Sequence, residues 1–112
     1  MGNLFHSIYF SLVDKSEANV AKLTDICAKY LAPHPGIQLY ASGGLTDIKR
    51  DVSVRNFDVG CDIVYESKQA YDDYLKSALH EDFFPATEGM IDNTYIFDSY
   101  LKSQSKVYSL TR

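Results

Sequence analysis

The segment YDDYLKSALHEDFF, residues 71–84, places a phenol, an imidazole and several aromatic rings close together. A histidine such as His80 ordinarily titrates near neutral pH, which suits a general base that removes a proton next to a carbonyl group. Tyr74 offers a phenol O–H that can hydrogen-bond to an oxygen on which charge develops. His6, far upstream, is placed to orient a substrate or relay a proton. The predicted catalytic residues are therefore His80, Tyr74 and His6.

Each of these residues also has a purely structural interpretation. A tyrosine on a helical stripe commonly packs in the core with its hydroxyl at the edge. A histidine just after a helix, as His80 is expected to be, can bind the last free carbonyl groups and favours the negative end of the dipole. A His6–His80 or His6–Tyr74 hydrogen bond made only for folding would account for both histidines. Residue types alone leave both interpretations open.

Other polar residues have simpler expectations. His34 lies in a Pro-rich turn and is expected to be in solvent. Lys49, Arg50 and Arg55 are expected in a solvated loop, with the alternative that they attract an acidic ligand to the mouth of a cleft. Asp98, in the last predicted strand, is expected to pair with a backbone amide or with His6.

Composition excludes several function classes. The chain has 112 residues and a formal net charge of -4, without a large basic patch, so nucleic acid is not an expected partner. No window approaches the roughly 20 apolar residues that span a bilayer. The N-terminal residues lack the features of a signal peptide. We therefore expect no membrane partner and a cytoplasmic location.

The cysteines and histidines do not form a metal-binding pattern. The three histidines are far apart in the sequence, and the two cysteines, Cys27 and Cys61, are not in a CxxC motif. The cysteines are expected to be reduced and buried, with a disulfide as the alternative. We expect no metal and no cofactor.

The hydrophobic pattern predicts one domain, 1–112, with a core of about 5–100 and a tail, 101–112, that is either a frayed end or an arm on a partner. Strands are predicted over 5–12, 37–44, 58–65 and 93–100. The first helix is expected to be capped by Asp14, with Glu17 completing a capping box. The second is expected to begin after Ser67, followed by a short helical turn that Pro85 and Gly89 end.

The order β-α-β-β-α-β predicts an α+β, ferredoxin-like fold: a four-stranded antiparallel sheet with two helices on one face. Strand alternation places His6 on the helix side and directs Phe5, Tyr9, Tyr40 and Val64 to the other side. Such a large apolar face requires a cover, and a second copy of the chain provides one by twofold symmetry. We therefore expect a homodimer in which two sheets pack face to face as an α/β barrel.

Three sequence segments resemble the stress-responsive dimeric α/β-barrel (Dabb) family over roughly residues 5–100: FHSIYFSL, FDVGCDIVYESKQAYDDYLKSALHEDFF and YIFDSY. The resemblance rests on the early-strand histidine, the tyrosine and histidine around the second helix, and the aspartate in the last strand. It implies a barrel-forming homodimer with a cleft between sheet and helices in each copy.

One branch of this family resembles olivetolic acid cyclase, which closes a polyketide chain by aldol chemistry. The resemblance implies that Tyr74, His80 and His6 line the cleft, while Val59 stands where the cyclase has a further histidine. Residues 77–80 read SALH where the family often reads HPxH. The expected pocket wall consists of Ile8, Phe10, Val59, Tyr71, Phe83 and Phe84.

These observations predict a small-molecule protein with cofactor-free lyase, cyclase or isomerase chemistry on a small apolar or carbonyl-bearing compound. The first alternative is a non-enzymatic stress-protection or ligand-binding dimer. The second is a cofactor-independent monooxygenase, which ranks last because the clefts of such enzymes are often rich in Trp and this chain has none.

Overall fold

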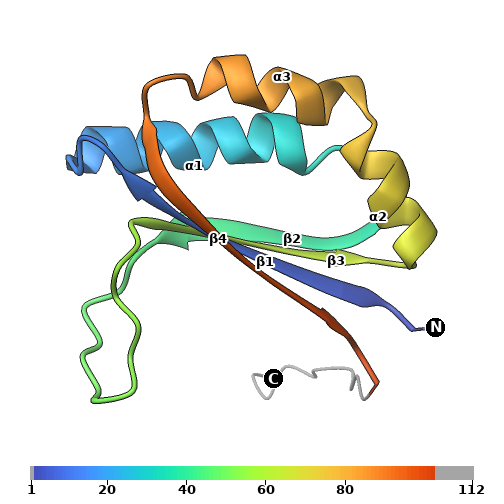
Figure 1. Ribbon diagram of the computed structural model, residues 1–112, viewed down its shortest axis with the longest axis horizontal. Coiled ribbons are helices and arrows are strands. Elements are labelled where there is room, and N and C mark those ends of the chain that lie inside the picture. The colour runs from blue at the N-terminus through green and yellow to red at the C-terminus, as the bar shows by residue number, and fades with distance from the viewer. Residues whose placement is uncertain (1, 103–112) are drawn as a thin grey trace, which may run out of the picture.

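The computed structural model describes residues 2–102, which form a four-stranded antiparallel sheet covered on one face by three helices (Figure 1). In chain order the elements are β1 (Leu4–Leu12), α1 (Glu17–Leu31), β2 (Ile37–Gly44), β3 (Val59–Tyr65), α2 (Lys68–Leu75), α3 (Ala78–Ala86) and β4 (Ile91–Tyr100). The strand order is β2-β3-β1-β4. The predicted ferredoxin-like fold is confirmed, with the second helical region divided into two helices.

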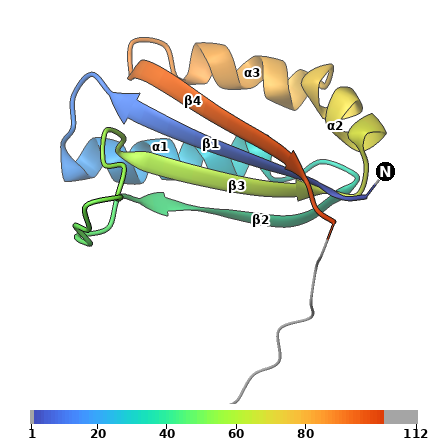
Figure 2. The ribbon, with the colours of Figure 1, turned by 60° about the horizontal axis from the view of Figure 1, so that its bottom comes forward.

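The central strand β1 lies between β3 and β4 and pairs with both (Figure 2). Its alternation is as predicted: His6, Ile8 and Phe10 are buried on the helix side. In register, His6 lies opposite Ile63 of β3 and opposite Asp98 of β4. The sheet therefore brings together two polar residues that are far apart in the sequence.

The core fills the space between α1 and the sheet. Among its most deeply buried members from these two layers are Leu23, Cys27, Leu31, Val59, Cys61 and Ile63. Full burial of one such aliphatic side chain contributes about 1.5–3 kcal/mol. Cys27 and Cys61 are free and buried. Contact with the Cys61 thiol, together with burial, raises the pKa of the Cys27 thiol, so that thiol stays protonated.

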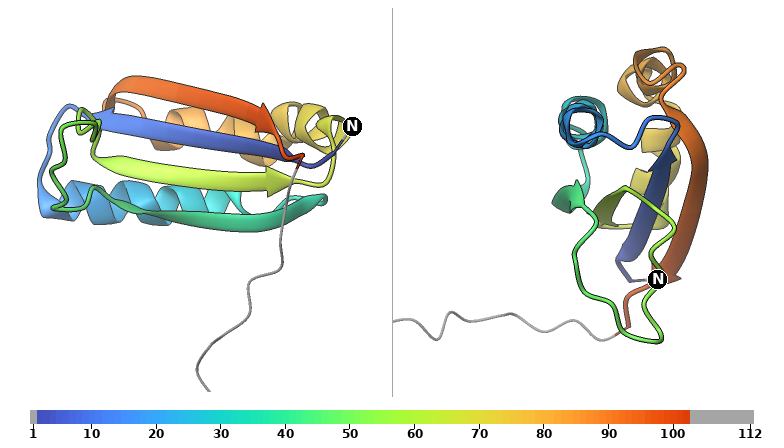
Figure 3. Two further views of the ribbon diagram at one scale, coloured as in Figure 1. Left: turned by 90° about the horizontal axis from the view of Figure 1, so that it is seen from below. Right: turned by 90° about the vertical axis from the view of Figure 1, so that its left-hand side faces the viewer.

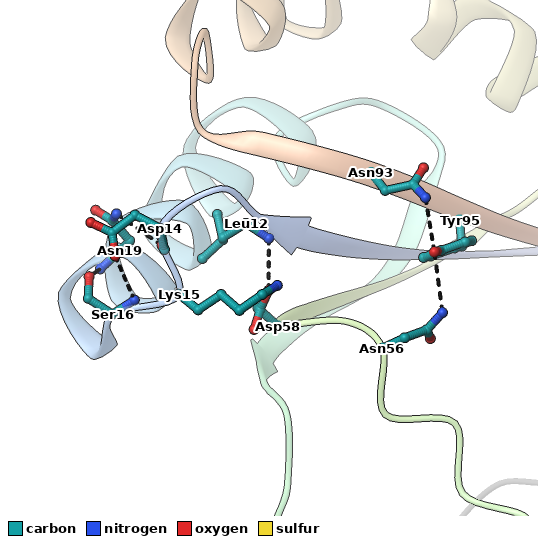
Figure 4. Close-up of polar contacts among 9 residues, drawn as sticks. All are labelled: Leu12, Asp14, Lys15, Ser16, Asn19, Asn56, Asp58, Asn93 and Tyr95. Carbon is teal, nitrogen blue, oxygen red and sulfur yellow. Dashed lines mark hydrogen bonds and ion pairs between the residues drawn. The ribbon is translucent and has the colours of Figure 1, made fainter.

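The start of α1 differs from the prediction. Ser16, not Asp14, is the N-cap: its Oγ accepts a hydrogen bond from the Asn19 amide at 3.2 Å (Figure 4). The Asp14 carboxylate accepts from the Ser16 amide at 3.1 Å and so shapes the turn before the helix. Glu17 is consequently the first helical residue, too early to complete a capping box. The cap of α2 is as predicted, since Ser67 Oγ accepts from the Ala70 amide.

The second correction concerns the expected short turn, which is the nine-residue helix α3. Ser77 caps it by accepting from the His80 amide at 3.2 Å. Pro85 lies inside the last turn and does not end the helix. A proline there removes a single backbone donor near the C-terminal end, where the hydroxyl of Thr87 adds hydrogen bonds to the Phe83 and Phe84 carbonyls.

The third correction concerns Tyr40, which was predicted on the face away from the helices. Its ring packs against the helix-side core, and its hydroxyl donates to Ser42 Oγ at 3.0 Å. The pairing of β2 with β3 shifts register between Ile37 and Leu39. This irregularity changes which residues of β2 face the helices, and simple alternation does not predict it.

The face of the sheet opposite the helices, here called the open face, carries aromatic residues. Tyr9 packs on Phe57 with ring centroids 4.8 Å apart, and Phe97 lies 6.0 Å from the Tyr9 ring. Residues 45–57, which we call the arm, project to this side of the sheet (Figures 1 and 3). The base of the arm is joined to β4 because Asn56 donates to the Tyr95 hydroxyl (Figure 4). Between arm and sheet lies a groove of about 700 Å³.

The predicted tail, 101–112, lies almost entirely outside the described residues, so neither alternative for it is addressed. Within residues 2–102, none of the helices combines the length and apolar character needed to cross a membrane.

Candidate functional site

A cavity of about 290 Å³ lies between the sheet and the helices α2 and α3. Its lining residues come from five elements: His6, Ile8, Phe10, Leu31, Tyr71, Tyr74, Leu75, His80, Phe83, Phe84, Thr87, Ile91, Thr94 and Ile96. The three predicted catalytic residues are therefore brought to one cavity, although β1 contributes one of them and the helical region contributes the others.

The predicted pocket wall is present with one exception. Ile8, Phe10, Tyr71, Phe83 and Phe84 all line the cavity. Val59 does not: it is fully buried in the core, at the start of β3. Alternation correctly places this residue on the helix side, but it does not tell which helix covers that part of the strand.

His6 is held by a carboxylate. Its Nδ1 is hydrogen-bonded to Oδ1 of Asp98, which settles the alternative left open for Asp98. An ionised carboxylate can only accept, so the neutral ring carries its proton on Nδ1 and keeps a lone pair on Nε2. The imidazole is almost completely buried, whereas the Asp98 side chain is 43% exposed at the sheet edge. The contact with Asp98 fixes the orientation of the His6 ring.

Two tyrosines from α2 stand beside His6. The Tyr71 ring lies 5.1 Å from the imidazole, and the Tyr74 ring is stacked 6.5 Å from Tyr71. Burial raises the pKa of Tyr74, although the neighbouring Tyr65 hydroxyl acts in the opposite direction. Burial also raises the pKa of Tyr71, and the Asp98 charge adds to the effect. Both phenols therefore remain neutral donors well above neutral pH.

His80 lies in the first turn of α3, not after a helix as predicted. Its ring packs edge-on against Tyr74 at 4.8 Å and against Phe84 at 5.2 Å. Burial lowers its pKa, and the His6 charge acts in the same direction, while a hydrogen bond to the Leu75 carbonyl opposes them. The imidazole is therefore neutral at pH 7. The hydrogen bond of His80 to a carbonyl at the end of α2 agrees with its structural interpretation. Its position in the wall of the cavity agrees with its functional interpretation.

One nearby residue was misjudged. His34 is not simply solvated: its ring contacts Tyr74 edge-on at 5.7 Å, and its Nδ1 is buried without a hydrogen-bond partner. His34 packs against Tyr74 and does not line the cavity. A histidine between two prolines gives no sequence signal of such packing.

Polar groups in the cavity are few, and none of the lining residues is a lysine or an arginine. Apolar and aromatic side chains make up most of the wall, which is typical of sites for small apolar ligands. The arrangement can accept a proton at His6 Nε2 and donate a hydrogen bond from Tyr74. Within residues 2–102, no group of three or more His, Cys, Asp or Glu side chains is placed to hold a metal ion.

Comparison with known proteins places the fold. No family model matches the sequence, and no curated protein matches it. A Dabb family protein from Mesorhizobium loti, with a ferredoxin-like fold, has a TM-score of 0.74 at 14% identity, covering 92% of this chain and 100% of its own. The chain has the ferredoxin-like fold of the Dabb structures.

Two further solved structures agree. A hydroxynitrile lyase from Passiflora edulis has a TM-score of 0.72 at 10% identity, covering 94% of this chain and 98% of its own. A dimeric ferredoxin-like protein of unknown function from Thermobifida fusca has a TM-score of 0.70 at 16% identity. The match covers 89% of this chain and 92% of that protein. The match to a Dabb structure agrees with the resemblance seen in the sequence motifs. Identities this low establish the fold, not an activity.

Proposed function

We propose that the chain is a homodimeric, cofactor-free catalyst that removes a proton from a small carbonyl compound in the cavity between the sheet, α2 and α3. The observation that carries this proposal is that His6, in the wall of a largely apolar cavity, is hydrogen-bonded to the carboxylate of Asp98. A buried imidazole oriented by a carboxylate is the usual arrangement of a protein general base. The reaction class is lyase, isomerase or cyclase chemistry, and the cited hydroxynitrile lyase has the same fold.

The roles within the site differ from those first expected. His6, rather than His80, is the base, because the Asp98 carboxylate orients its ring, whereas burial disfavours a charge on His80. Nε2 of His6 takes the proton from the carbon next to the carbonyl group. Tyr74, kept neutral by its environment, donates to the oxygen on which the negative charge collects. His80 is a neutral wall residue that completes the polar side of the cavity.

The cavity also limits the substrate. With no lysine or arginine in its lining, it has no group to pair with a carboxylate or phosphate. The Asp98 charge nearby would further repel anions. At about 290 Å³, the cavity is at the small end of known ligand pockets. The preferred substrate is therefore a small, neutral, largely apolar aldehyde or ketone.

The proposed assembly is a dimer through the open face. Phe5, Tyr9, Phe57 and Phe97 line the groove on that face, and an aromatic surface of this kind marks an interface in soluble proteins. The Thermobifida fusca protein with the same fold is dimeric. A twofold contact between two open faces covers the same patch in both copies.

The decisive experiment follows proton abstraction directly. The purified protein is incubated in D₂O with a panel of small neutral ketones and aldehydes, and exchange of the α-hydrogens is followed by NMR. We expect exchange above the buffer rate for at least one apolar member of the panel. The variant Asp98→Asn should lose about a hundredfold or more of this rate, since the amide no longer stabilises the imidazolium.

Asp92→Asn is the matched control, because Asp92 is an exposed aspartate on the same strand. It should exchange at the unaltered rate. Compounds that bind and shift NMR signals of the protein, with no exchange across the panel, would favour the non-enzymatic ligand-binding alternative. Equal exchange rates in Asp98→Asn and the unaltered protein would contradict the assignment of His6 as the base.

A further inference from the structure

The cavity is open on one side. Three of its lining residues, Leu75, Phe84 and Ile96, are large apolar residues exposed to solvent, and these are called the mouth. Phe84 is 59% exposed and Ile96 is 52% exposed. Ile96 belongs to β4, the edge strand, on the helix side opposite Ile8. Apolar side chains at the entrance of an apolar site favour a further covering element.

The arm, residues 45–57, carries a second group of exposed apolar side chains. Ile48, Val52 and Val54 all lie largely in solvent, and Val52 is 76% exposed. The arm extends on the side of the open face, while the helices lie on the other side of the sheet, so the arm would have to pass around its own sheet to reach the mouth of its own chain (Figure 3). Within residues 2–102, the arm and the mouth together account for six of the large exposed apolar residues.

The arm is well ordered by internal hydrogen bonds although its tip is in water. Arg55 Nη1 donates to the carbonyl oxygens of Thr46 and Ile48, each at 2.7 Å. Near the tip, the Ser53 amide donates to the Arg50 carbonyl, and the Arg50 amide donates to Ser53 Oγ, both at 3.0 Å. A loop held in one conformation loses little entropy when it docks, which favours binding.

The charges of the two surfaces are complementary. Lys49 and Arg50 are exposed beside Val52 on the arm, which has more basic than acidic residues in a chain that is acidic overall. Glu81 and Asp82 are exposed on α3, one turn from Phe84. Opposite charges around an apolar contact guide association and fix its register.

We infer that the arm of one copy lies over the mouth of the other copy, so that each cavity is closed by its partner. This rests on the proposed dimer through the open face, because in that dimer each arm extends past its own sheet to the level of its partner. Of the partner's two sheet edges, β4 is the one with apolar residues exposed on both of its faces, Ile96 and Phe97. A ligand in the cavity would thus contact Val52 or Val54 of the second copy.

The test is a cross-link between two differently tagged copies produced together. One carries Val52→Cys, the other carries Ile96→Cys, and the mixed dimer is isolated through both tags. A short bismaleimide should then give a covalent product that contains both tags, while either variant alone gives little. Native Cys27 and Cys61 do not interfere, because both are fully buried. Val13→Cys in place of Val52→Cys is the matched control, since Val13 is exposed but lies outside both surfaces.

A mixed dimer that cross-links no better than the Val13 control would overturn the placement of the arm and leave the dimer intact. A protein that light scattering finds monomeric at every concentration would overturn both the arm contact and the proposed assembly. Proton exchange by a monomer would show that the chemistry at His6 does not depend on either. The three results separate the arm, the dimer and the catalytic site from one another.

Discussion

At the scale of single residues, the site depends on how two histidines differ. His6 is held by a carboxylate at the sheet edge, whereas His80 packs among rings and bonds to a backbone carbonyl. The same side chain is thus oriented by a carboxylate in one place, and in the other it lies in an environment that disfavours a proton. The proposed function assigns the base to the first and a neutral wall residue to the second.

The lowered pKa of His80 predicts a pH dependence of stability. In the unfolded chain the group takes up a proton at its ordinary value of 6.5, while the folded protein resists protonation to a lower pH. The free energy of unfolding should therefore fall as pH drops below about 6.5 and level off below the folded-state pKa. Denaturant unfolding between pH 7.5 and 5 should show this decrease in the unaltered protein, and the decrease should be smaller in the variant His80→Gln. If the free energy of unfolding depended on pH in the same way in both proteins, the prediction would be contradicted.

At the scale of elements, α3 presents His80 to the cavity, and its starting point sets the position of that ring. Ser77 fixes the start by accepting from the His80 amide, and it also donates to the Tyr74 carbonyl at 2.7 Å. One side chain therefore joins the end of α2 to the beginning of α3. The relative placement of Tyr74 and His80 depends on this short connection.

Ser77→Ala should lower the free energy of unfolding by about 1 kcal/mol, the usual cost of a lost N-cap. For a domain of this size that is a decrease in Tm of roughly 4–8 °C. Ser67→Ala, which removes the N-cap of α2, should lower the Tm by about as much. Only Ser77→Ala should also weaken binding of a cavity ligand, measured by NMR titration. Equal effects of the two variants on binding would argue against Ser77 as a positioning residue.

At the scale of the whole molecule, the open face is the proposed dimer interface. Aromatic rings line the groove on this face, and Phe97 is among its most exposed residues. In the proposed dimer this ring is buried against the second copy. A charge introduced there would be buried without a partner, at a cost of several kcal/mol.

Phe97→Asp should therefore weaken the dimer at least about a hundredfold, since each 1.4 kcal/mol changes a dissociation constant tenfold. Light scattering over a dilution series measures this directly. Val13→Asp introduces the same charge at an exposed residue outside the interface and should dimerise normally. Unchanged dimerisation of Phe97→Asp would show that the assembly uses another surface.

Sequence patterns were sufficient for the fold, because strand alternation and helical stripes follow directly from backbone geometry. They were also sufficient to place His6 and Tyr74 on the helix side, whereas the position of His80 in the cavity was implied by the family resemblance. They failed where the position of a side chain depends on the adjacent elements. The register shift between β2 and β3 that turns Tyr40 inward was not predicted, and neither was the helix that covers Val59. The pairing of Asp98 with His6 required the sheet order, which places β4 beside β1.

That pairing has a consequence for biosynthesis. His6 and Asp98 are 92 residues apart in sequence, and the strand that carries Asp98 is the final one described. While the chain is being made, β1 can pair with β3, but the backbone groups on its other edge can form hydrogen bonds with β4 only after β4 has been made. Closing so long a loop is entropically slow. The proposed base and the carboxylate that orients it can therefore be brought together only after β4 has been made.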